Sequence, residues 1–464
     1  MPEPAALDAA ANSSLAMRHS VNIAIVASLA GLLFGFDTAV ISGVTQALRE
    51  VFHLSPARLG TAVSSALWGT LCGALFMGKP GDRFGTRDTL KLVGVLYIVS
   101  AAGSALAGSM QSFMIFRFIG GLAIGGSTVL APVYIAEIAP ASRRGALVGL
   151  FQLNIVLGIL AAYLSNFLIG EFVHDEVWRW KMFSGAVPSA IFLSLLFTIP
   201  QSPRWLVVRG RLAEAARVLR ELGHADPEAE LRQFSQGDGA VDAGGAKLSW
   251  RAHRRPILLA ITLALFNQFS GINAILYYLN DIFRAAGFSS LSADLQSVAI
   301  GAANFAATGA ALCVIDRLGR KTLLLTGAVG MMLALIGVTL IMASGQGQYW
   351  LLWMLIGFIV SFAFSQGAVI WVYLSEIFPS AVRARGQSLG CATHWIANAV
   401  ISGLFPVIAA RTRALPFAVF ASCMLLQFFV VWAFFPETKG VVLESMREAL
   451  AKGARPSPRS VAGA

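Results

Sequence analysis

The chain has 464 residues, of which 56% are hydrophobic and only 13% are charged, whereas ordinary soluble domains have roughly 25% charged residues. This composition excludes a soluble globular protein. It indicates a membrane protein instead, because the apolar residues occur in runs of about 20, the length that crosses ~30 Å of hydrocarbon. The formal net charge of +11 is distributed over short loops between these runs, so we expect no nucleic acid partner.

The apolar runs predict twelve membrane-spanning helices. In chain order these spans begin near residues 20, 59, 89, 112, 146, 182, 256, 295, 322, 349, 386 and 414. Residues 1–19 form an N-terminal tail without an apolar core, so the first run is expected to be a retained span and not a cleaved signal. A segment of soluble composition, 201–255, separates six spans in 20–200 from six spans in 256–435, and 436–464 form a C-terminal tail.

The basic residues indicate the orientation of the spans. Most of the 35 Lys and Arg residues lie in the loops on one side of the predicted spans. Arg117 lies inside a span, and the loops on the other side hold Arg49, Arg58, Arg179, Lys181, Arg284, Arg411 and Arg413. Because loops rich in Lys and Arg stay in the cytoplasm, both termini are expected to be cytoplasmic.

The cysteines and the polar motifs give no sign of an enzyme. Cys72, Cys313, Cys391 and Cys423 lie inside apolar runs and form no CxxC pair, so neither a disulfide framework nor a zinc site is indicated. No nucleophile and base stand at a convincing spacing, and no metal-binding cluster is evident. We therefore expect no catalytic residues, no metal and no cofactor.

Matching motifs recur in the two halves of the chain. GDRFGTR (81–87) follows the second span, and DRLGRK (316–321) follows the eighth. Glu137 and Glu376 each begin a Glu-Ile-x-Pro motif, after the fourth and the tenth span. Two parallel six-span repeats of this kind predict a transport site at their interface, near the bilayer midplane.

Charged residues in these loop motifs are candidates for a cytoplasmic gate. Asp and Arg in fixed register beside a tight Gly turn can form ion pairs between span ends, which hold the gate shut in one state and break in the other. The alternative is that they only set the orientation of the spans. The candidate members are Asp82, Arg83, Glu137, Arg144, Asp316, Arg317, Glu376 and Arg383.

Eight motifs together carry a family resemblance. They are GLLFGFDTAVISG (31–43), GDRFGTR (81–87), RFIGGLAIG (117–125), PQSPRWL (200–206), NQFSGINAILYY (267–278), DRLGRK (316–321), SEIFPSAVR (375–383) and PETKG (436–440). With them the chain resembles the sugar porter family of the major facilitator superfamily, from about residue 20 to residue 440. The resemblance implies an all-α membrane protein with twelve helices in two pseudo-symmetric six-helix bundles and a small cytoplasmic helical segment. It also implies a functional monomer in a bacterial inner membrane.

Four residues depart from the family pattern. Gln201 stands where the family usually has Glu, Asn267 where it has Gln, Ala368 where it has Pro, and His394 where it often has Gln or Asn. These departures bear on which sugar is preferred and not on the family.

Two ionisable residues lie inside predicted spans. A charge in hydrocarbon is costly and usually functional. At 1.5 Å per residue, Asp37 and Arg117 lie about 10 Å and about 8 Å below the outer ends of spans 1 and 4, so they can pair. The pair is either a permanent salt bridge or a device in which Asp37 exchanges a proton and Arg117 holds it while ionised. By resemblance, proton-coupled members carry an Asp in this motif, which favours symport over uniport.

A set of amide, imidazole and indole side chains suits a neutral sugar. Amides donate and accept hydrogen bonds, as sugar hydroxyls require, and indole faces pack against sugar rings. The alternative for each amide is a bond to a neighbouring helix; beside Gly271 a local helix break could also expose backbone groups. By family correspondence the substrate-binding residues are Gln152, Asn267, Gln268, Asn273, Asn304, Trp371, His394 and Trp395. His394 is either a neutral stand-in for an amide or a second titratable site.

The leading hypothesis is proton-coupled symport of a neutral monosaccharide by alternating access, with Asp37 as the proton carrier. A hexose such as glucose is favoured because Ile159 stands where some pentose-transporting relatives have Gln. One rival is a facilitative uniporter in which Asp37 stays locked to Arg117. A second rival is a transporter-like sugar sensor, for which a tail longer than 436–464 would be expected.

Overall fold

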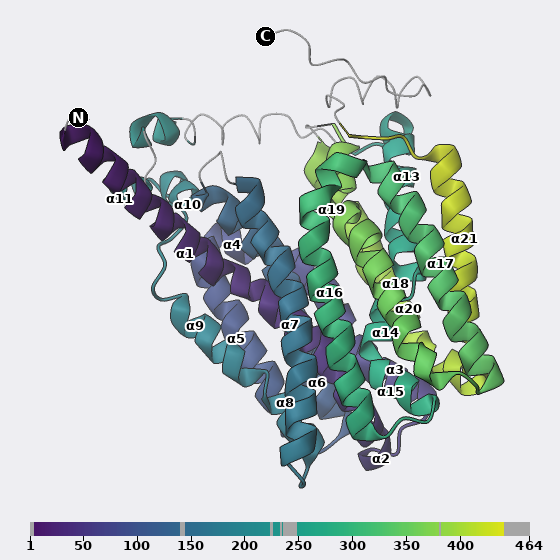
Figure 1. The fold of residues 1–464 in the computed structure, drawn as a ribbon. Helices are drawn as coiled ribbons and strands as arrows, with labels where there is room; N and C mark the ends of the chain where they lie inside the picture. The colour runs from purple at the N-terminus through teal and green to yellow at the C-terminus, as the bar shows by residue number, and fades with distance from the viewer. Residues whose placement is uncertain are drawn as a thin grey trace. The chain divides into compact units, whose positions relative to one another are not determined.

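A computed structural model describes residues 4–139, 144–222, 226–232, 234, 248–379 and 382–439, with side chains for these except 4–19, 144, 315–317 and 384. Within these residues the regular elements are helices and no strand occurs. Figure 1 labels the helices in chain order. The all-α class predicted from composition is therefore confirmed for the described part of the chain.

The helices of the first half correspond to predicted spans 1–6. They are α1 (Pro4–Val40), α3 (Pro56–Phe76), α5 (Thr86–Ala105), α6 (Met110–Ile138), α7 (Arg144–Phe172), and the pair α8 (Val177–Phe183) and α9 (Ala186–Leu195). Short helices connect or follow them, namely η1 (Ile41–Gly43), α2 (Thr45–Val51), α4 (Gly78–Phe84), α10 (Pro203–Val208) and α11 (Leu212–Glu221).

The helices of the second half correspond to predicted spans 7–12. Span 7 is divided into α13 (Trp250–Phe269), α14 (Ile272–Tyr277) and α15 (Leu279–Ala285), and span 10 into α18 (Leu351–Phe362), the π-helix η3 (Ala363–Gly367) and α19 (Ala368–Glu376). The other spans are α16 (Ser290–Leu318), α17 (Arg320–Ser344), α20 (Arg383–Arg411) and α21 (Leu415–Phe434); η2 (Gln348–Trp350) precedes α18.

Among the described residues, eleven helical segments are long and apolar enough to cross a membrane. The remaining predicted span is the pair α8 and α9, which a turn at Ser184 and Gly185 interrupts, so that neither piece reaches that length. Figure 1 shows α8 and α9 as separate helices.

The chain folds into two compact units. Unit 1 holds Met1–Asp37, Gly69–Ile159 and Met182–Gly245, and unit 2 holds Thr38–Trp68, Leu160–Lys181 and Ala246–Ala464. Unit 2 thus includes two segments from the first six spans. The predicted domain boundaries, which follow the sequence repeat, stay a prediction.

In unit 1, α1 and α7 touch through glycines. A Cβ atom at Gly35 would lie 1.8 Å from the carbonyl oxygen of Ile155, and one at Gly158 would lie 2.0 Å from that of Leu32. Small residues of this kind let the backbones of two membrane helices approach closely. This contact fixes α1 two residues before Asp37.

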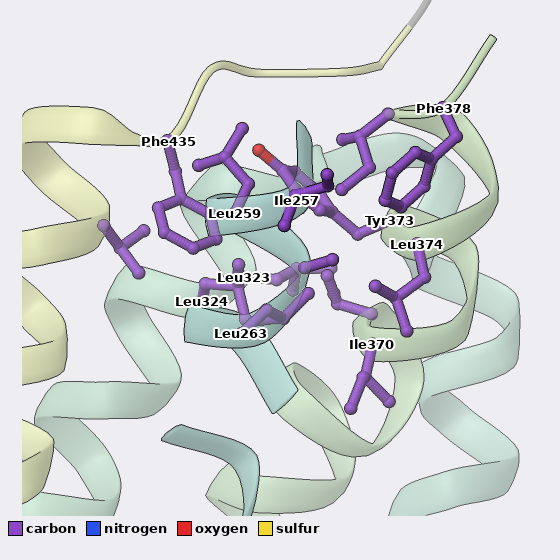
Figure 2. Packing of buried hydrophobic residues seen from close by; sticks show 14 of the residues in the cluster. Ile257, Leu259, Leu263, Leu323, Leu324, Ile370, Tyr373, Leu374, Phe378 and Phe435 are labelled. Carbon is purple, nitrogen blue, oxygen red and sulfur yellow. The ribbon is translucent and has the colours of Figure 1, made fainter. Parts of the chain in front are cut away.

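In unit 2, an apolar cluster joins one end of α13, α17, α19 and α21. Figure 2 shows its side chains turned toward one another, and its members include Ile257, Leu259, Leu263, Leu323, Leu324, Ile370, Tyr373, Leu374, Phe378 and Phe435. Because lipid is as apolar as these side chains, close van der Waals packing is what stabilises such a cluster in a membrane protein. Phe435 of this cluster directly precedes segment 436–439 along the chain, so the cluster helps to position that segment.

Span 7 breaks at Gly271, whose φ of +82° is a left-handed conformation. Glycine adopts this conformation without steric cost, and a Cβ atom here would also lie 2.2 Å from the ring of Phe420. The break separates Gln268 on α13 from Asn273 on α14. It lets both amide side chains turn toward each other, as the next section describes.

Candidate functional site

Asp37 and Arg117 form an ion pair inside unit 1. Nη1 of Arg117 lies 2.5 Å from Oδ1 of Asp37, and Nη2 donates to the carbonyl oxygen of Asp37 at 3.4 Å. The side chain of Arg117 is only 3% exposed and that of Asp37 only 13%. The pairing predicted from their depths is therefore present, and it joins α1 to α6.

The second carboxylate oxygen of Asp37 is differently placed. Oδ2 is buried and has no hydrogen-bond partner among the described residues. Ser100 packs closely against Gly120 beside this carboxylate, since a Cβ atom at Gly120 would lie 2.3 Å from Oγ of Ser100 and 3.6 Å from Oδ1 of Asp37. One oxygen of the carboxylate is thus held by a guanidinium group, while the other remains available to bind a proton.

Four of the predicted sugar-binding side chains form one hydrogen-bonded cluster in unit 2. Nε2 of Gln268 donates to Oδ1 of Asn267 at 3.0 Å and lies 3.2 Å and 3.1 Å from Nδ1 and Nε2 of His394. Oε1 of Gln268 accepts from Nδ2 of Asn273 at 3.0 Å. With this amide orientation His394 must accept a hydrogen bond, which requires a neutral imidazole. The geometry favours the neutral amide-like interpretation of His394.

Two indoles flank the imidazole of this cluster. The ring centroid of His394 lies 5.3 Å from that of Trp371 and 5.1 Å from that of Trp395. Trp371 is 40% exposed whereas Trp395 is buried. The unit therefore presents an aromatic face next to an amide cluster, the combination that recognises a polyhydroxy ring.

The other two predicted sugar-binding residues lie on long helices. Asn304 is buried on α16 of unit 2, where its Oδ1 accepts from Thr308 at 3.5 Å. Gln152 lies half-buried on α7 of unit 1.

A second amide pair, which was not predicted from the sequence, lies next to this cluster. Nε2 of Gln366 on η3 donates to Oε1 of Gln427 on α21 at 2.6 Å, and both residues are fully buried. The carbonyl oxygen of Gln366 also accepts a 3.5 Å bond from Asn267. The available signal was a glutamine in each of two otherwise apolar spans. A π-helix, which often marks a functional site, carries the first of them.

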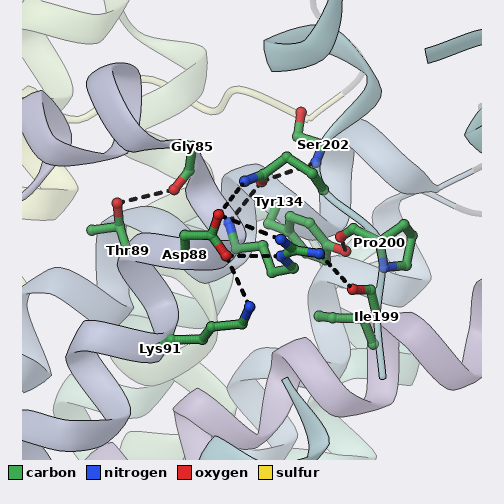
Figure 3. Close-up of polar contacts among 10 residues, drawn as sticks. Gly85, Asp88, Thr89, Lys91, Tyr134, Ile199, Pro200 and Ser202 are labelled. Atoms are coloured by element: carbon green, nitrogen blue, oxygen red, sulfur yellow. Dashed lines mark hydrogen bonds and ion pairs between the residues drawn. The ribbon is translucent and has the colours of Figure 1, made fainter. Parts of the chain in front are cut away.

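At one end of unit 1, Gln201 caps the start of α5 (Figure 3). Its Oε1 accepts from the backbone N–H groups of Arg87 and Ser202, each at 3.1 Å, and its Nε2 donates to Oδ2 of Asp88 at 3.2 Å. Asp88 also pairs with Arg87 at 3.0 Å and with Lys91 at 2.9 Å. We call these five residues the Gln201 cluster.

Unit 2 contains the matching arrangement at the start of α17. Oε1 of Glu437 accepts from the backbone N–H of Arg320 at 2.8 Å, and Oε2 accepts from that of Lys321 at 3.1 Å. Each capped helix follows a glycine of positive φ, +94° at Gly85 and +88° at Gly319. The repeated Gly turn of the sequence thus has the same backbone geometry in both units.

The Glu-Ile-x-Pro motifs also make equivalent contacts. Ser202 donates to Glu137 at 2.6 Å, and Thr438 donates to Glu376 at 2.5 Å. A tyrosine three residues before each glutamate makes a further equivalent contact. The hydroxyl of Tyr134 donates to the carbonyl oxygen of Pro200 at 2.6 Å, and that of Tyr373 donates to the carbonyl oxygen of Pro436 at 3.1 Å. Segments 200–202 and 436–438 are therefore a third repeated motif. The sequence analysis missed it because only the proline is identical.

The remaining gate candidates are placed as follows. Glu376 pairs with Arg320 at 3.0 Å. The side chains of Asp82 and Arg83 are exposed, and their backbone carbonyls accept from Arg209 at 3.5 Å and 2.5 Å. Arg383 is half-buried in the first turn of α20. The side chains of Arg144, Asp316 and Arg317 lie outside the described part of the structure.

Replacing Gln201 by glutamate, the usual family residue, tests the Gln201 cluster. In Gln201→Glu a carboxylate oxygen replaces the N–H that now donates to Asp88, so two like charges would lie about 3 Å apart and disfavour each other. We expect a melting temperature several degrees lower at neutral pH, and a smaller deficit at acid pH because protonation removes one charge. Differential scanning fluorimetry in detergent measures this. Gln201→Glu combined with Asp88→Asn, which leaves a single carboxylate at this contact, is the matched control and should lack the recovery at acid pH. An unchanged or raised melting temperature for Gln201→Glu would contradict this account.

A family model described as "Sugar (and other) transporter" matches residues 23–450. The chain is 36% identical over 476 residues to the D-xylose-proton symporter of Escherichia coli (strain K12), covering 94% of this chain and 96% of that protein. It is 35% identical over 459 residues to the glucose facilitated diffusion protein of Zymomonas mobilis, covering 92% and 96% of the two chains.

A solved structure shows the same fold. The inward open conformation of the xylose transporter XylE from E. coli superposes with a TM-score of 0.84 at 34% sequence identity, covering 93% of this chain and 99% of that chain. The predicted twelve-helix major facilitator fold is therefore confirmed. The chain is a multi-pass membrane transporter and not an enzyme, and it belongs to the sugar transporter family.

Proposed function

We propose that the protein is a proton-coupled symporter of a neutral monosaccharide that works by alternating access. The observation that carries this proposal is the Asp37 carboxylate, with Oδ1 held by Arg117 and Oδ2 without a partner among the described residues. The relative named as a D-xylose-proton symporter supports the same conclusion. We further propose a functional monomer in a bacterial inner membrane with both termini in the cytoplasm, as the distribution of basic residues indicates.

The proton acts on the contact between α1 and α6. While Asp37 is ionised, Arg117 attracts it in a poorly solvated environment where Coulomb attraction is strong. A proton on Oδ2 removes the negative charge, so the attraction between opposite charges is lost and only a hydrogen bond from the charged guanidinium to Oδ1 remains. Protonation therefore loosens α1 from α6, while the glycine contact between α1 and α7 remains. Sugar and proton are coupled if the loosened state is the one that changes conformation.

The amide and indole cluster around Gln268 is the proposed sugar site. No fixed charge occurs among its described members, and its amides can both donate and accept, which suits a neutral polyhydroxy solute. Family correspondence adds Asn304 of unit 2, and Gln152 of unit 1 remains a prediction from the sequence. Relatives named for xylose and for glucose support a monosaccharide. We propose a hexose such as glucose as the substrate, because Ile159 stands where some pentose-transporting relatives have Gln.

The predicted gate residues are proposed to act at the cytoplasmic ends of the spans. Gln201 binds the start of span 3 to the segment after span 6, and Glu437 binds the start of span 9 to the segment after span 12. These contacts would keep the span ends of each half together while the protein changes conformation. The ion pair between Arg320 and Glu376 and the exposed Asp82 and Arg83 are the charges that such movement would bring together or separate.

Uptake of labelled glucose into sealed proteoliposomes tests the proposal. With an inward gradient of two pH units, symport of one proton per sugar allows up to about 100-fold accumulation, because each pH unit is equivalent to a tenfold concentration ratio. Competition by unlabelled glucose and xylose then ranks the two sugars, and glucose should compete better. Equilibration without accumulation would instead establish the facilitative uniporter, the alternative that the relative named as a glucose facilitated diffusion protein favours.

A further inference from the structure

A second buried ion pair lies in unit 2, away from the proposed proton site. Nζ of Lys181 lies 2.8 Å from Oδ2 of Asp294, and the two side chains are only 5% and 3% exposed. Nζ also donates to the carbonyl oxygen of Gly43 at 3.3 Å. A buried lysine with a buried aspartate is rare in membrane helices unless it has a function.

Both oxygens of Asp294 are occupied. Nδ2 of Asn280 donates to Oδ1, and Ser297 in turn donates to Oδ1 of Asn280 at 2.6 Å. This arrangement differs from that of Asp37, whose Oδ2 has no partner among the described residues. Asp294 therefore lacks the unpartnered oxygen on which the proton proposal for Asp37 rests.

The pair joins the two sequence halves. Lys181 and Gly43 belong to the first six spans, whereas Asp294, Asn280 and Ser297 belong to the last six, yet all five lie in unit 2. Gly170 of α7 packs against the pair as well, since a Cβ atom there would lie 3.1 Å from Oδ2 of Asp294. The first and second halves are thus connected here by an ionic contact.

The position of the pair along α16 indicates which side of the membrane it faces. Asp294 is in the second turn of α16, while Leu318 at the other end of the helix adjoins the Glu437 arrangement. At 1.5 Å per residue these two points are about 36 Å apart, enough to cross the ~30 Å hydrocarbon core of a membrane. With the proposed cytoplasmic location of Glu437, the Lys181 pair lies at the outer ends of the spans.

We propose that Lys181 and Asp294 form a latch that holds the outer ends of the two halves together and opens once in each transport cycle. The inference rests on the proposed alternating access. A buried ion pair suits this task because its attraction is largely cancelled by the cost of removing both charges from water. When the outer side opens, water hydrates both charges again, so closed and open states differ little in free energy.

Variants of the latch have opposite expected effects. Asp294→Asn or Lys181→Met leaves one buried charge without its partner, which strongly destabilises the closed state. The exchanged pair Lys181→Asp with Asp294→Lys restores opposite charges. Replacing both, as in Lys181→Met with Asp294→Leu, removes the cost of desolvation, and apolar replacements of buried ion pairs are often stabilising. This double variant should hold the outer side closed.

Distances between spin labels report on the latch directly. Labels at exposed Arg58 and Gln346, which belong to the first and second halves, are introduced into the full chain after its four cysteines are replaced by serine. Double electron-electron resonance in nanodiscs without sugar then measures the ratio of long to short distances. We expect Asp294→Asn and Lys181→Met to raise this ratio at least tenfold, the exchanged pair to bring it back toward the starting value, and the apolar double variant to lower it.

Arg179→Met is the matched control. Arg179 lies two residues from Lys181, but the side chains of its ion pair with Glu176 are 26% and 67% exposed, far more than those of the latch, and pairs that water reaches contribute little. Its distance ratio should match that of the starting chain. If all latch variants also keep the starting ratio, the latch does not exist. Because the distances are measured without sugar or a proton gradient, failure of the proposed sugar or of proton coupling would appear only in the uptake assay.

Discussion

Asp37→Asn is expected to abolish proton-driven accumulation of sugar while sugar exchange across the membrane continues. The asparagine keeps an oxygen that can accept from Arg117, so the contact between α1 and α6 is retained in the form that it has when Asp37 is protonated. It cannot gain or lose a proton, however, so the gradient has no group on which to act. With an inward gradient of two pH units, the accumulation ratio should fall from as much as about 100 to about 1.

Two assays on the same proteoliposomes separate coupling from transport. Gradient-driven uptake measures accumulation, and counterflow, with equal pH on both sides and unlabelled sugar inside, measures exchange. Glu176→Gln is the matched control, because it neutralises one carboxylate that is 67% exposed and paired only with Arg179 in the described structure. Its accumulation should equal that of the natural chain.

Other results would change the assignment in defined ways. If Asp37→Asn still accumulates sugar, the proton is carried elsewhere, and the Asp37–Arg117 pair is a permanent salt bridge. If Asp37→Asn loses both exchange and accumulation but remains folded by size-exclusion chromatography, the charge of Asp37 is required for the conformational change itself.

The apolar runs predicted the spans well, because hydrocarbon thickness imposes their minimum length. The start of span 1 expected near residue 20 agrees with the membrane-spanning segment Ser20–Gly43, although the helix α1 itself begins at Pro4. Span 7 was expected to begin near 256, whereas α13 begins at Trp250, with a kink at His253 inside it. Apolar patterning measures the buried length of a helix and not its full length.

Breaks inside spans were harder to predict than the spans. Gly271 was recognised as a place where the helix could break, because glycine alone adopts its φ of +82° at no steric cost. The π-helix at Ala363–Gly367 has no comparable sequence signal. It depends on how Ser365 and Gln366 pack against other helices, and such tertiary contacts are not encoded in local periodicity.

Some pairs of polar residues could be predicted from the sequence and others could not. Asp37 and Arg117 could be paired from the sequence because both stand out as charges inside apolar runs at similar depth. Lys181 was assigned to a loop as one more orientation signal, since its partner Asp294 is 113 residues away. The two become an ion pair only when segments from both halves pack together in unit 2. Gln366 and Gln427 escaped notice because they are 61 residues apart and meet only when their two helices pack together.

Gln268→Ala is expected to reduce sugar affinity strongly, because this one amide organises the whole cluster. Its Nε2 contacts Asn267 and His394, and its Oε1 accepts from Asn273. The alanine side chain leaves those three partners without their bond and removes a group that could bind a hydroxyl. Since an unsatisfied buried polar group costs about 1–3 kcal/mol, a loss of about 2 kcal/mol, or roughly 30-fold in Kd, is a reasonable expectation.

Binding measured by titration calorimetry at one pH tests this, with the melting temperature recorded in parallel. Asn154→Ala is the matched control, because Asn154 is also an amide in a span but bonds to Ser28 and to the backbone of Leu150. Its removal should lower stability slightly and leave Kd within about twofold. An equal loss of affinity in both variants would mean that binding follows general stability and not the Gln268 cluster.

Gln268→Glu distinguishes a sugar site from a purely structural cluster. A carboxylate can accept from Asn273 and from the N–H of a neutral His394, but it cannot donate to Oδ1 of Asn267. Because the introduced carboxylate takes up a proton as the pH falls and can then donate, affinity in this variant should improve at lower pH, whereas affinity of the natural chain should vary much less over the same range. A flat profile in Gln268→Glu would show that the donor group at residue 268 does not govern sugar binding, and would leave the indoles of Trp371 and Trp395 as the main determinants.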